Sequence, residues 1–137
     1  MIEKTWAIAE KLIIDILFLT EQLNQQLAQE ADILKSAPTA GSLDVSSANK
    51  KQLVSRLEEL NQHFIQILAI EKLPNDQAGI NEYFQRATLV GLSTSETVNN
   101  WKQIQLICTE CKNLNEQNGA SIELLSLHAK RSLDILK

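Results

Sequence analysis

The feature that most limits how this chain can fold is its scarcity of residues that interrupt helices. Its 137 residues include only 4 glycines and 2 prolines, and Leu, Ile, Gln and Glu are common. No run of alternating Val, Thr or Tyr is bounded by hairpin turns, so strands are not expected. The length suits one domain. The sequence therefore predicts a single all-α domain over residues 1–137, built from long helices.

Three long helices are predicted, over about residues 2–35, 47–72 and 94–136. In the first, apolar residues recur in steps of three and four, interrupted by Thr20 and Glu30, and this spacing forms one buried stripe. Its members are Ala9, Ile13, Ile16, Leu23, Leu27 and Leu34.

The second helix is expected after a loop, "SAPTAGSLDVSS" at residues 36–47, in which Pro38 and Gly41 break the pattern. Ser46 or Ser47 would cap the helix, and Pro74 would end it. Its predicted stripe is Leu53, Leu57, Leu60, Phe64, Ile67 and Leu68. Residues 75–92 are expected to be irregular, with room for a short helix that folds Tyr83 and Phe84 back onto the core.

The third helix begins with Ser93 and Glu96 at capping-box spacing, and after them only Gly119 interrupts the pattern. Its stripe also has coiled-coil spacing, with an apolar start and a polar middle. The members are Trp101, Ile104, Cys108, Cys111, Asn115, Asn118, Ile122, Leu125, Ala129, Ser132 and Leu136.

Helices joined by modest loops pack most simply as an elongated up-down-up bundle, here with the C-terminal helix longest. The first and third helices would then be parallel, with Trp6 and Trp101 at the same end. Because the second helix is shorter, the last turns of the third would be poorly covered. A leucine-bearing helix end without an internal partner suggests a partner from outside.

Charge and motifs argue against several function classes. The formal net charge is −4 without a dense basic block, so neither nucleic acid nor a membrane is an expected partner. The "CTEC" motif, Cys108 and Cys111, lies in mid-helix and is interpreted as two buried thiols, because a closed zinc site needs four ligands. No catalytic residues, metal or cofactor are expected. No secretory leader pattern is visible, which predicts a cytoplasmic protein.

The stretch "NLNEQNG" places poor helix formers in the middle of the third helix. Asparagines in a helix seam weaken it but fix its register, and Gly119 allows another backbone to approach closely. One interpretation is a local kink with the asparagines facing water. The other is a recognition point for a helix of another chain.

These residues carry a resemblance to a known family. The segment "CKNLNEQNGASIELLSLHAKRSLDILK" resembles the C-terminal signature of the FlgN family of flagellar export chaperones. That signature has an N-x-x-N-G stretch, an apolar residue or two, and a basic end with L-x-x-L. The match covers about residues 108–137, and the two helices before it fit the family as well.

The resemblance implies a small cytoplasmic protein that binds hook-associated (hook–filament junction) proteins through its C-terminal helix. Such a protein prevents their premature assembly and delivers them to the flagellar type III export apparatus. The client-binding residues implied here are Leu114, Asn118, Gly119, Ile122, Leu125, Leu133 and Leu136. The apolar members would bury an amphipathic client helix, and Asn118 with Gly119 would set register and spacing.

An alternative of a different class stays open. The same stripe could pair with another copy of the chain, and the asparagines would then specify the oligomeric state. The protein would in that case be a self-associating coiled-coil structural or adaptor protein without an export client. Within the chaperone interpretation, too, the sequence leaves a homodimer open.

Overall fold

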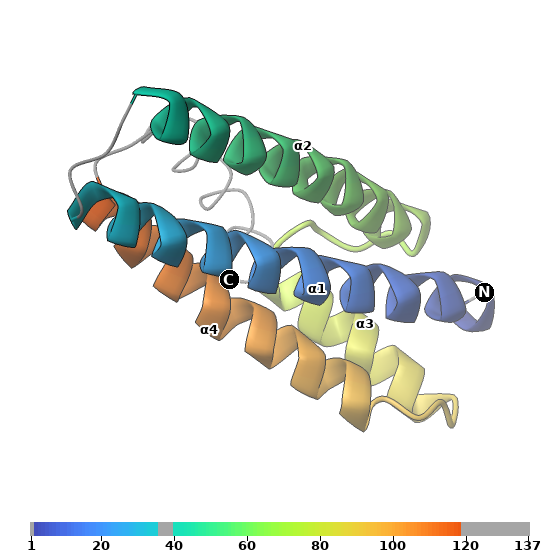
Figure 1. Ribbon diagram of the computed structural model, residues 1–137. Helices are drawn as coiled ribbons and strands as arrows, with labels where there is room; N and C mark the ends of the chain where they lie inside the picture. Colours follow the sequence, from blue (N-terminus) through green and yellow to red (C-terminus); the bar gives the residue numbers. More distant parts are fainter. Residues whose placement is uncertain (1, 36–39, 119–137) are drawn as a thin grey trace.

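The chain folds, in the computed structural model, into helices joined by short connections, and the structure describes residues 2–35 and 40–118. The helices are α1 (Ile2–Lys35), α2 (Ala40–Ile70), α3 (Gln77–Leu89) and α4 (Ser95–Asn118) (Figure 1). Within these ranges there is no strand, so the all-α class is confirmed. The expected count of three helices is wrong, because α3 is a separate fourth helix.

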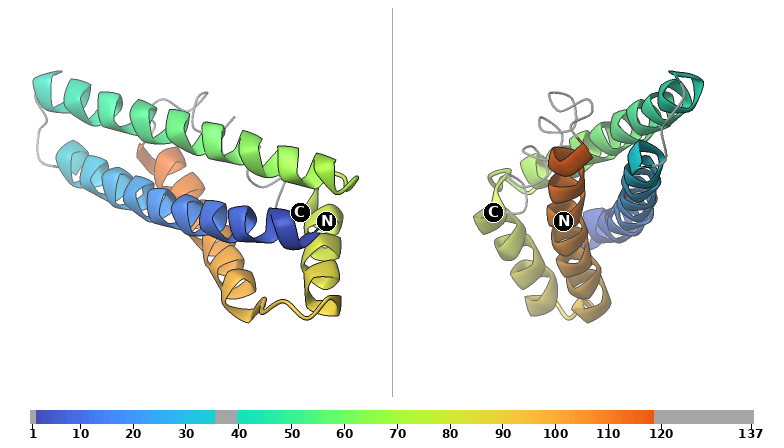
Figure 2. Two further views of the ribbon diagram at one scale, coloured as in Figure 1. Left: turned by 90° about the vertical axis from the view of Figure 1, so that its right-hand side faces the viewer. Right: turned by 60° about the vertical axis from the view of Figure 1, so that its left-hand side comes forward.

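The first helix is the centre of the arrangement. It packs along its length against α2 on one side and α4 on the other, whereas α2 and α4 have few direct contacts (Figures 1 and 2). As expected, α2 runs antiparallel to α1 and α4 runs parallel to it. The short α3 lies at one end of the molecule, beside the start of α1 and the end of α2. It therefore closes only part of the space between α2 and α4.

The predicted stripe of α1 is the main part of the core. Ala9, Ile13 and Leu27 are fully buried, and Ile16 and Leu23 are 3% exposed. The two polar interruptions are buried as well. The hydroxyl of Thr20 donates to the carbonyl of Ile16 at 2.6 Å, which satisfies it within the helix. The start and end of α1 agree with the predicted range of 2–35.

The start of α2 differs from the prediction. The helix begins at Ala40 and ends at Ile70, so neither Ser46 nor Ser47 caps it. Glycine and serine are poor helix formers, but each costs at most about 1 kcal/mol. Only Pro38 forbids a helix in this segment, and the helix begins two residues after it. Helix propensity alone therefore predicted the start of α2 too far along the chain.

The buried face of α2 is rotated from the predicted stripe. Leu57, Phe64, Ile67 and Leu68 are buried as expected. Leu53 and Leu60, however, are only partly buried against the core. Val54 and Asn61 are buried on the neighbouring side of the helix. A helix that contacts α1 on one side and α3 on another needs a broader buried face than one narrow stripe.

A local capping motif fixes each end of α3. Its first turn is capped by Asp76, whose side chain accepts from the backbone N–H of Gly79 at 2.9 Å. A Cβ on Gly79 would lie 1.9 Å from the carbonyl oxygen of Pro74, so only glycine fits there. At the other end the N–H of Leu92 donates to the carbonyl of Ala87, with Gly91 at φ 88° between them. This is the Schellman pattern.

Aromatic rings from all the helices meet at the end of the molecule where α3 lies. Phe64 of α2 stacks on Trp101 of α4, with ring centroids 5.3 Å apart. Trp6 of α1 contacts Tyr83 and Phe84 of α3, at 5.8 and 6.1 Å. The predicted return of Tyr83 and Phe84 to the core is thus confirmed, as is the placement of both tryptophans at one end.

The start of α4 lies one residue later than predicted. Its first helical hydrogen bond runs from the N–H of Val98 to the carbonyl of Thr94, which makes Thr94 the cap residue rather than Ser93. The described part of α4 ends at Asn118. The predicted continuation over 119–136 lies outside the described residues.

The aromatic cluster should account for a large share of stability. Phe64 is fully buried, and Phe64→Ala is expected to lower the unfolding free energy by about 3–5 kcal/mol through lost burial and a cavity. Leu89, which is 78% exposed, provides the control, and Leu89→Ala should change it by less than about 0.5 kcal/mol. Urea denaturation followed by circular dichroism measures both. Equal effects of the two substitutions would contradict the proposed role of the cluster.

Candidate functional site

Two of the seven predicted client-binding residues lie in the described part of α4. Leu114 and Asn118 are both half-buried, and Leu114 packs against the edge of the core. The remaining predicted residues lie outside the described residues: Gly119, Ile122, Leu125, Leu133 and Leu136. The structure therefore shows how this candidate site begins, at the last turns of α4.

The contact between α1 and α4 changes from apolar to polar along its length. Ile104 and Cys108 are buried in the apolar half. One turn further, the thiol of Cys111 lies 3.9 Å from the carbonyl oxygen of Thr20, and Asn115 is 3% exposed. The last turn is held by Asn118. The predicted inward stripe from Trp101 to Asn115 is thus confirmed, including its polar middle.

Asn118 joins a buried polar junction between three helices. Its amide donates to the carbonyl of Leu27 at 2.9 Å and to Oε1 of Glu30 at 3.1 Å, both on α1. The other carboxylate oxygen of Glu30 forms a close ion pair with Lys50 of α2. Glu30 and Lys50 are only 2% and 1% exposed. A buried pair of this kind fixes relative positions more than it adds stability.

Sequence reasoning missed this junction. Glu30 appeared only as an interruption of the α1 stripe, and Lys50 was not singled out. The available signal was the position of Glu30, three residues after Leu27 on a stripe whose other interruption is the uncharged Thr20. A charge at such a position needs a partner, and the partner could not be identified before the register of α2 was known.

Asn115 contains a buried acceptor without a donor. Its Oδ1 makes no hydrogen bond within the described residues, although the side chain is 3% exposed. An unsatisfied buried acceptor costs about 1–3 kcal/mol. The seam next to the predicted recognition stretch is therefore weaker than an apolar one would be, as the sequence indicated.

The two cysteines are buried and unpaired, at 8% and 7% exposure. Burial raises the pKa of each thiol to about 12, and at Cys111 the nearby charges of Cys108 and Glu110 add to the effect. A thiol with such a pKa stays protonated at neutral pH and is a poor nucleophile or metal ligand. The interpretation of "CTEC" as buried seam residues is confirmed. No three potential metal ligands come together within the described ranges.

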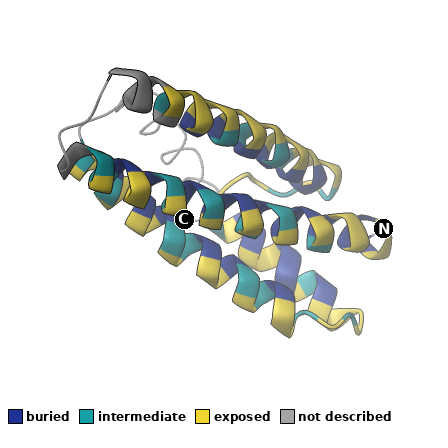
Figure 3. Cartoon of the chain, viewed as in Figure 1, coloured by how far each residue is buried: buried dark blue, intermediate teal, exposed yellow. Residues whose placement is uncertain are grey.

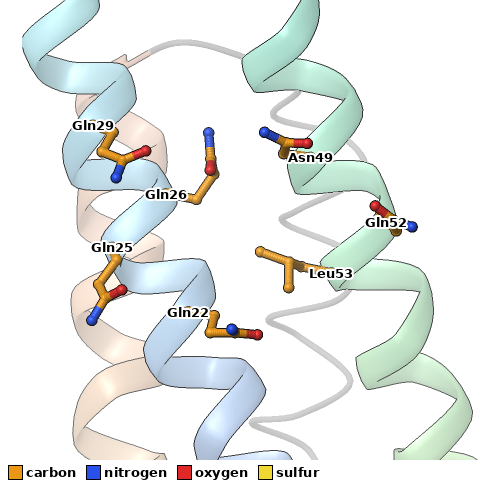
Figure 4. Close-up of a pocket in the computed structure, with 7 residues that line it drawn as sticks. All are labelled: Gln22, Gln25, Gln26, Gln29, Asn49, Gln52 and Leu53. Atoms are coloured by element: carbon orange, nitrogen blue, oxygen red, sulfur yellow. The ribbon is translucent and has the colours of Figure 1, made fainter.

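A polar cleft lies between α1 and α2, on the side of α1 away from the core (Figure 4). Its volume is about 260 Å³, below the range of about 300–1,000 Å³ that is usual for small-molecule sites. Its lining consists of carboxamides and one leucine, namely Gln22, Gln25, Gln26, Gln29, Asn49, Gln52 and Leu53. The lining has no charged side chain. Size and chemistry suit part of a polypeptide surface better than a small ligand.

The described helices have both buried and exposed sides, and the exposed residues face outward (Figure 3). None of the helices in the described ranges is both long and apolar enough to span a bilayer.

Comparison with known proteins identifies the class to which this helical arrangement belongs. The family model described as "FlgN protein" matches residues 9–137, which is nearly the whole chain. Neither the comparison with curated proteins nor that with solved structures gave a match. The chain belongs to the FlgN family, a family of flagellar export chaperones, and the resemblance noted in the sequence is confirmed.

Breaking the buried ion pair should be costly. Lys50→Met leaves the buried Glu30 carboxylate without its cation and is expected to cost about 3–5 kcal/mol in unfolding free energy. Adding Glu30→Leu removes the stranded charge and should recover much of that loss. The control is Glu82→Gln in the exposed pair with Arg86, which should cost less than about 0.5 kcal/mol. Urea denaturation measures all these variants, and a loss for Lys50→Met no larger than that for the control would contradict the proposed role of the ion pair.

The buried thiols should make the fold sensitive to alkaline pH. In the unfolded chain they ionise near the ordinary pKa of 9.0, whereas in the folded protein they hold their protons up to about 12. Between these values the unfolded state binds fewer protons, so stability falls as pH rises. A Cys108→Ala/Cys111→Ala variant should show a shallower decline in unfolding free energy than the parent. Parallel declines would show that the thiols do not contribute. Burial also raises the pKa of Tyr83 to about 12. Because Tyr83 is present in both proteins, its ionisation does not affect the comparison.

Proposed function

We propose that this protein is a cytoplasmic export chaperone for hook-associated flagellar proteins. It binds them before secretion, prevents their premature assembly and delivers them to the flagellar type III export apparatus. It does this by binding alone, as one helical domain without catalysis, metal or cofactor. The observation that carries the proposal is the family match over residues 9–137.

The proposed client site begins at the last turns of α4 and continues through the predicted residues. Leu114, Ile122, Leu125, Leu133 and Leu136 would bury the apolar face of an amphipathic client helix. Such helix-in-groove binding keeps an otherwise exposed client terminus from aggregating. Asn118 and Gly119 would set the register and the approach of the two chains.

The polar junction supports this assignment. Asn118 is held by two acceptors on α1, so the point at which the proposed site leaves the described fold is fixed in position. The unsatisfied oxygen of Asn115 lies one turn earlier. A chaperone must also release its client, and a contact diluted by asparagines is weaker than an all-leucine one.

Client capture tests the proposal. A purified hook-associated protein should co-elute with the parent chaperone, and Leu125→Asp combined with Leu133→Asp should weaken binding by more than about tenfold, because charges would enter a buried apolar contact. Leu89→Asp, at a leucine on α3 that is 78% exposed, is the matched control and should bind normally. Unchanged capture by the double variant would place the site elsewhere.

The alternative is a coiled-coil protein that self-associates through the same C-terminal stripe and has no client. Sedimentation over a range of concentrations separates the two functions. Under the alternative, the double variant would lose its oligomer, and the parent would bind no hook-associated protein. Under the proposal, the parent captures the client and the double variant loses that capture.

A further inference from the structure

The side of α1 opposite its buried stripe contains two large exposed apolar residues. Ile14 is 54% exposed and Phe18 is 59% exposed. They lie four residues apart and are therefore neighbours on one face of the helix. Their exposure shows that no other described helix covers this face, and α2 and α4 lie to either side of α1 (Figure 1). Together the two side chains form a contiguous exposed apolar surface in the middle of the helix.

These two residues lie in the middle of a longer stripe, which we call the outer stripe of α1. Its members recur in steps of three and four, and all of them are exposed. They are Lys4, Ala7, Lys11, Ile14, Phe18, Glu21, Gln25, Ala28 and Asp32. The charged members before Phe18 are basic, and those after it are acidic.

This distribution makes the outer stripe complementary to itself when reversed. Lys4 lies as far before Phe18 as Asp32 lies after it. Two copies that pair antiparallel, with Phe18 against Phe18, therefore bring each Lys4 opposite the Asp32 of the second copy. Lys11 then comes within reach of Glu21 of the second copy. Parallel pairing would instead put like charges together, which is unfavourable.

We propose that two copies of this protein form an antiparallel, two-fold symmetric dimer through the outer stripe of α1. Symmetry makes the contact isologous, so each residue appears twice. Ile14 and Phe18 form its apolar centre, and the charged ends set the direction. The outer stripe contains none of the residues predicted to bind the client.

The amide-lined cleft fits the same arrangement. Ile14 and Gln22 are equally distant from Phe18, so Ile14 of the second copy would lie opposite Gln22, at the edge of the cleft. Leu53 supplies apolar surface there. The other lining groups are carboxamides, which can form hydrogen bonds across an interface without the cost of burying a charge. The absence of charges from this lining favours a close protein contact over a solvated surface.

Sedimentation equilibrium from about 1 μM to about 300 μM tests the dimer, a range suited to a weak contact. Phe18→Asp should raise the dimer dissociation constant by about a hundredfold, because a tenfold loss on each side is counted twice in a symmetric contact. Phe18 is exposed, so the variant should keep its helical circular dichroism. Leu89→Asp, the control, should dimerise like the parent.

A cross-linking experiment tests the symmetry. Phe18→Cys places a thiol near the two-fold axis, and mild oxidation should give a disulfide-linked dimer. The native cysteines are buried with raised pKa, so they should not compete. Leu89→Cys, which is more exposed, should link far less. Equal linking by both variants would mean random collision and would overturn the proposal.

A charge exchange tests the direction. Lys4→Glu should weaken the dimer, and adding Asp32→Lys should restore it, because the exchanged pair again has opposite charges. A protein that remains monomeric at about 300 μM would overturn the proposal, since even a weak specific dimer is populated there. So would a dimer that Phe18→Asp leaves intact, because its contact would then lie on another surface.

Discussion

The fold depends on one constraint, the need of α1 to bury its apolar stripe against two helices that scarcely contact each other. Ala9, Ile13 and Leu27 are fully buried only because α2 and α4 flank the same helix. The apolar half is completed by α3, whose Tyr83 and Phe84 fill the end between the tryptophans. Interior packing of this density specifies the structure more than any single hydrogen bond does.

At the opposite end of the molecule, polar contacts between the helices specify the structure. The ion pair of Glu30 and Lys50 and the amide of Asn118 join α1, α2 and α4 where α3 does not reach. Buried polar groups tolerate few alternative arrangements, since each must find its partner. The register of α4 on α1 is thus fixed next to the segment that the family relationship makes the candidate for client binding. Apolar packing fixes the arrangement of the helices at one end of the molecule, and buried polar contacts fix it at the other end.

Much of this fold could be predicted from periodicity, and the errors have physical causes. The range of α1, its stripe and the inward face of α4 followed from spacing alone, because long helices with one buried face leave a clear pattern. The start of α2 was placed too late because Gly41 and the serines were read as a loop, although only Pro38 forbids a helix. The separate α3 lacked a long stripe, being a 13-residue helix whose burial comes from its neighbours.

The candidate site was less accessible to sequence reasoning. The polar stretch near Asn115 and Asn118 could be recognised from composition, but its contacts on α1 depend on a register that only the structure gives. Lys50 is the clearest case. A lysine on a helix is ordinarily solvated, and nothing near Lys50 in sequence indicates that it lies beside Glu30.

The parallel placement of α1 and α4 also has a consequence for synthesis. Asn118 donates to the backbone of Leu27 across 91 positions of sequence, so this hydrogen bond is among the most distant in the described part of the chain. During translation α1 and α2 emerge well before α4, and one flank of the α1 stripe stays uncovered in that interval. Each newly made molecule therefore passes through a stage in which its own apolar surface lacks cover, and that stage lasts until the ribosome has released the whole of α4.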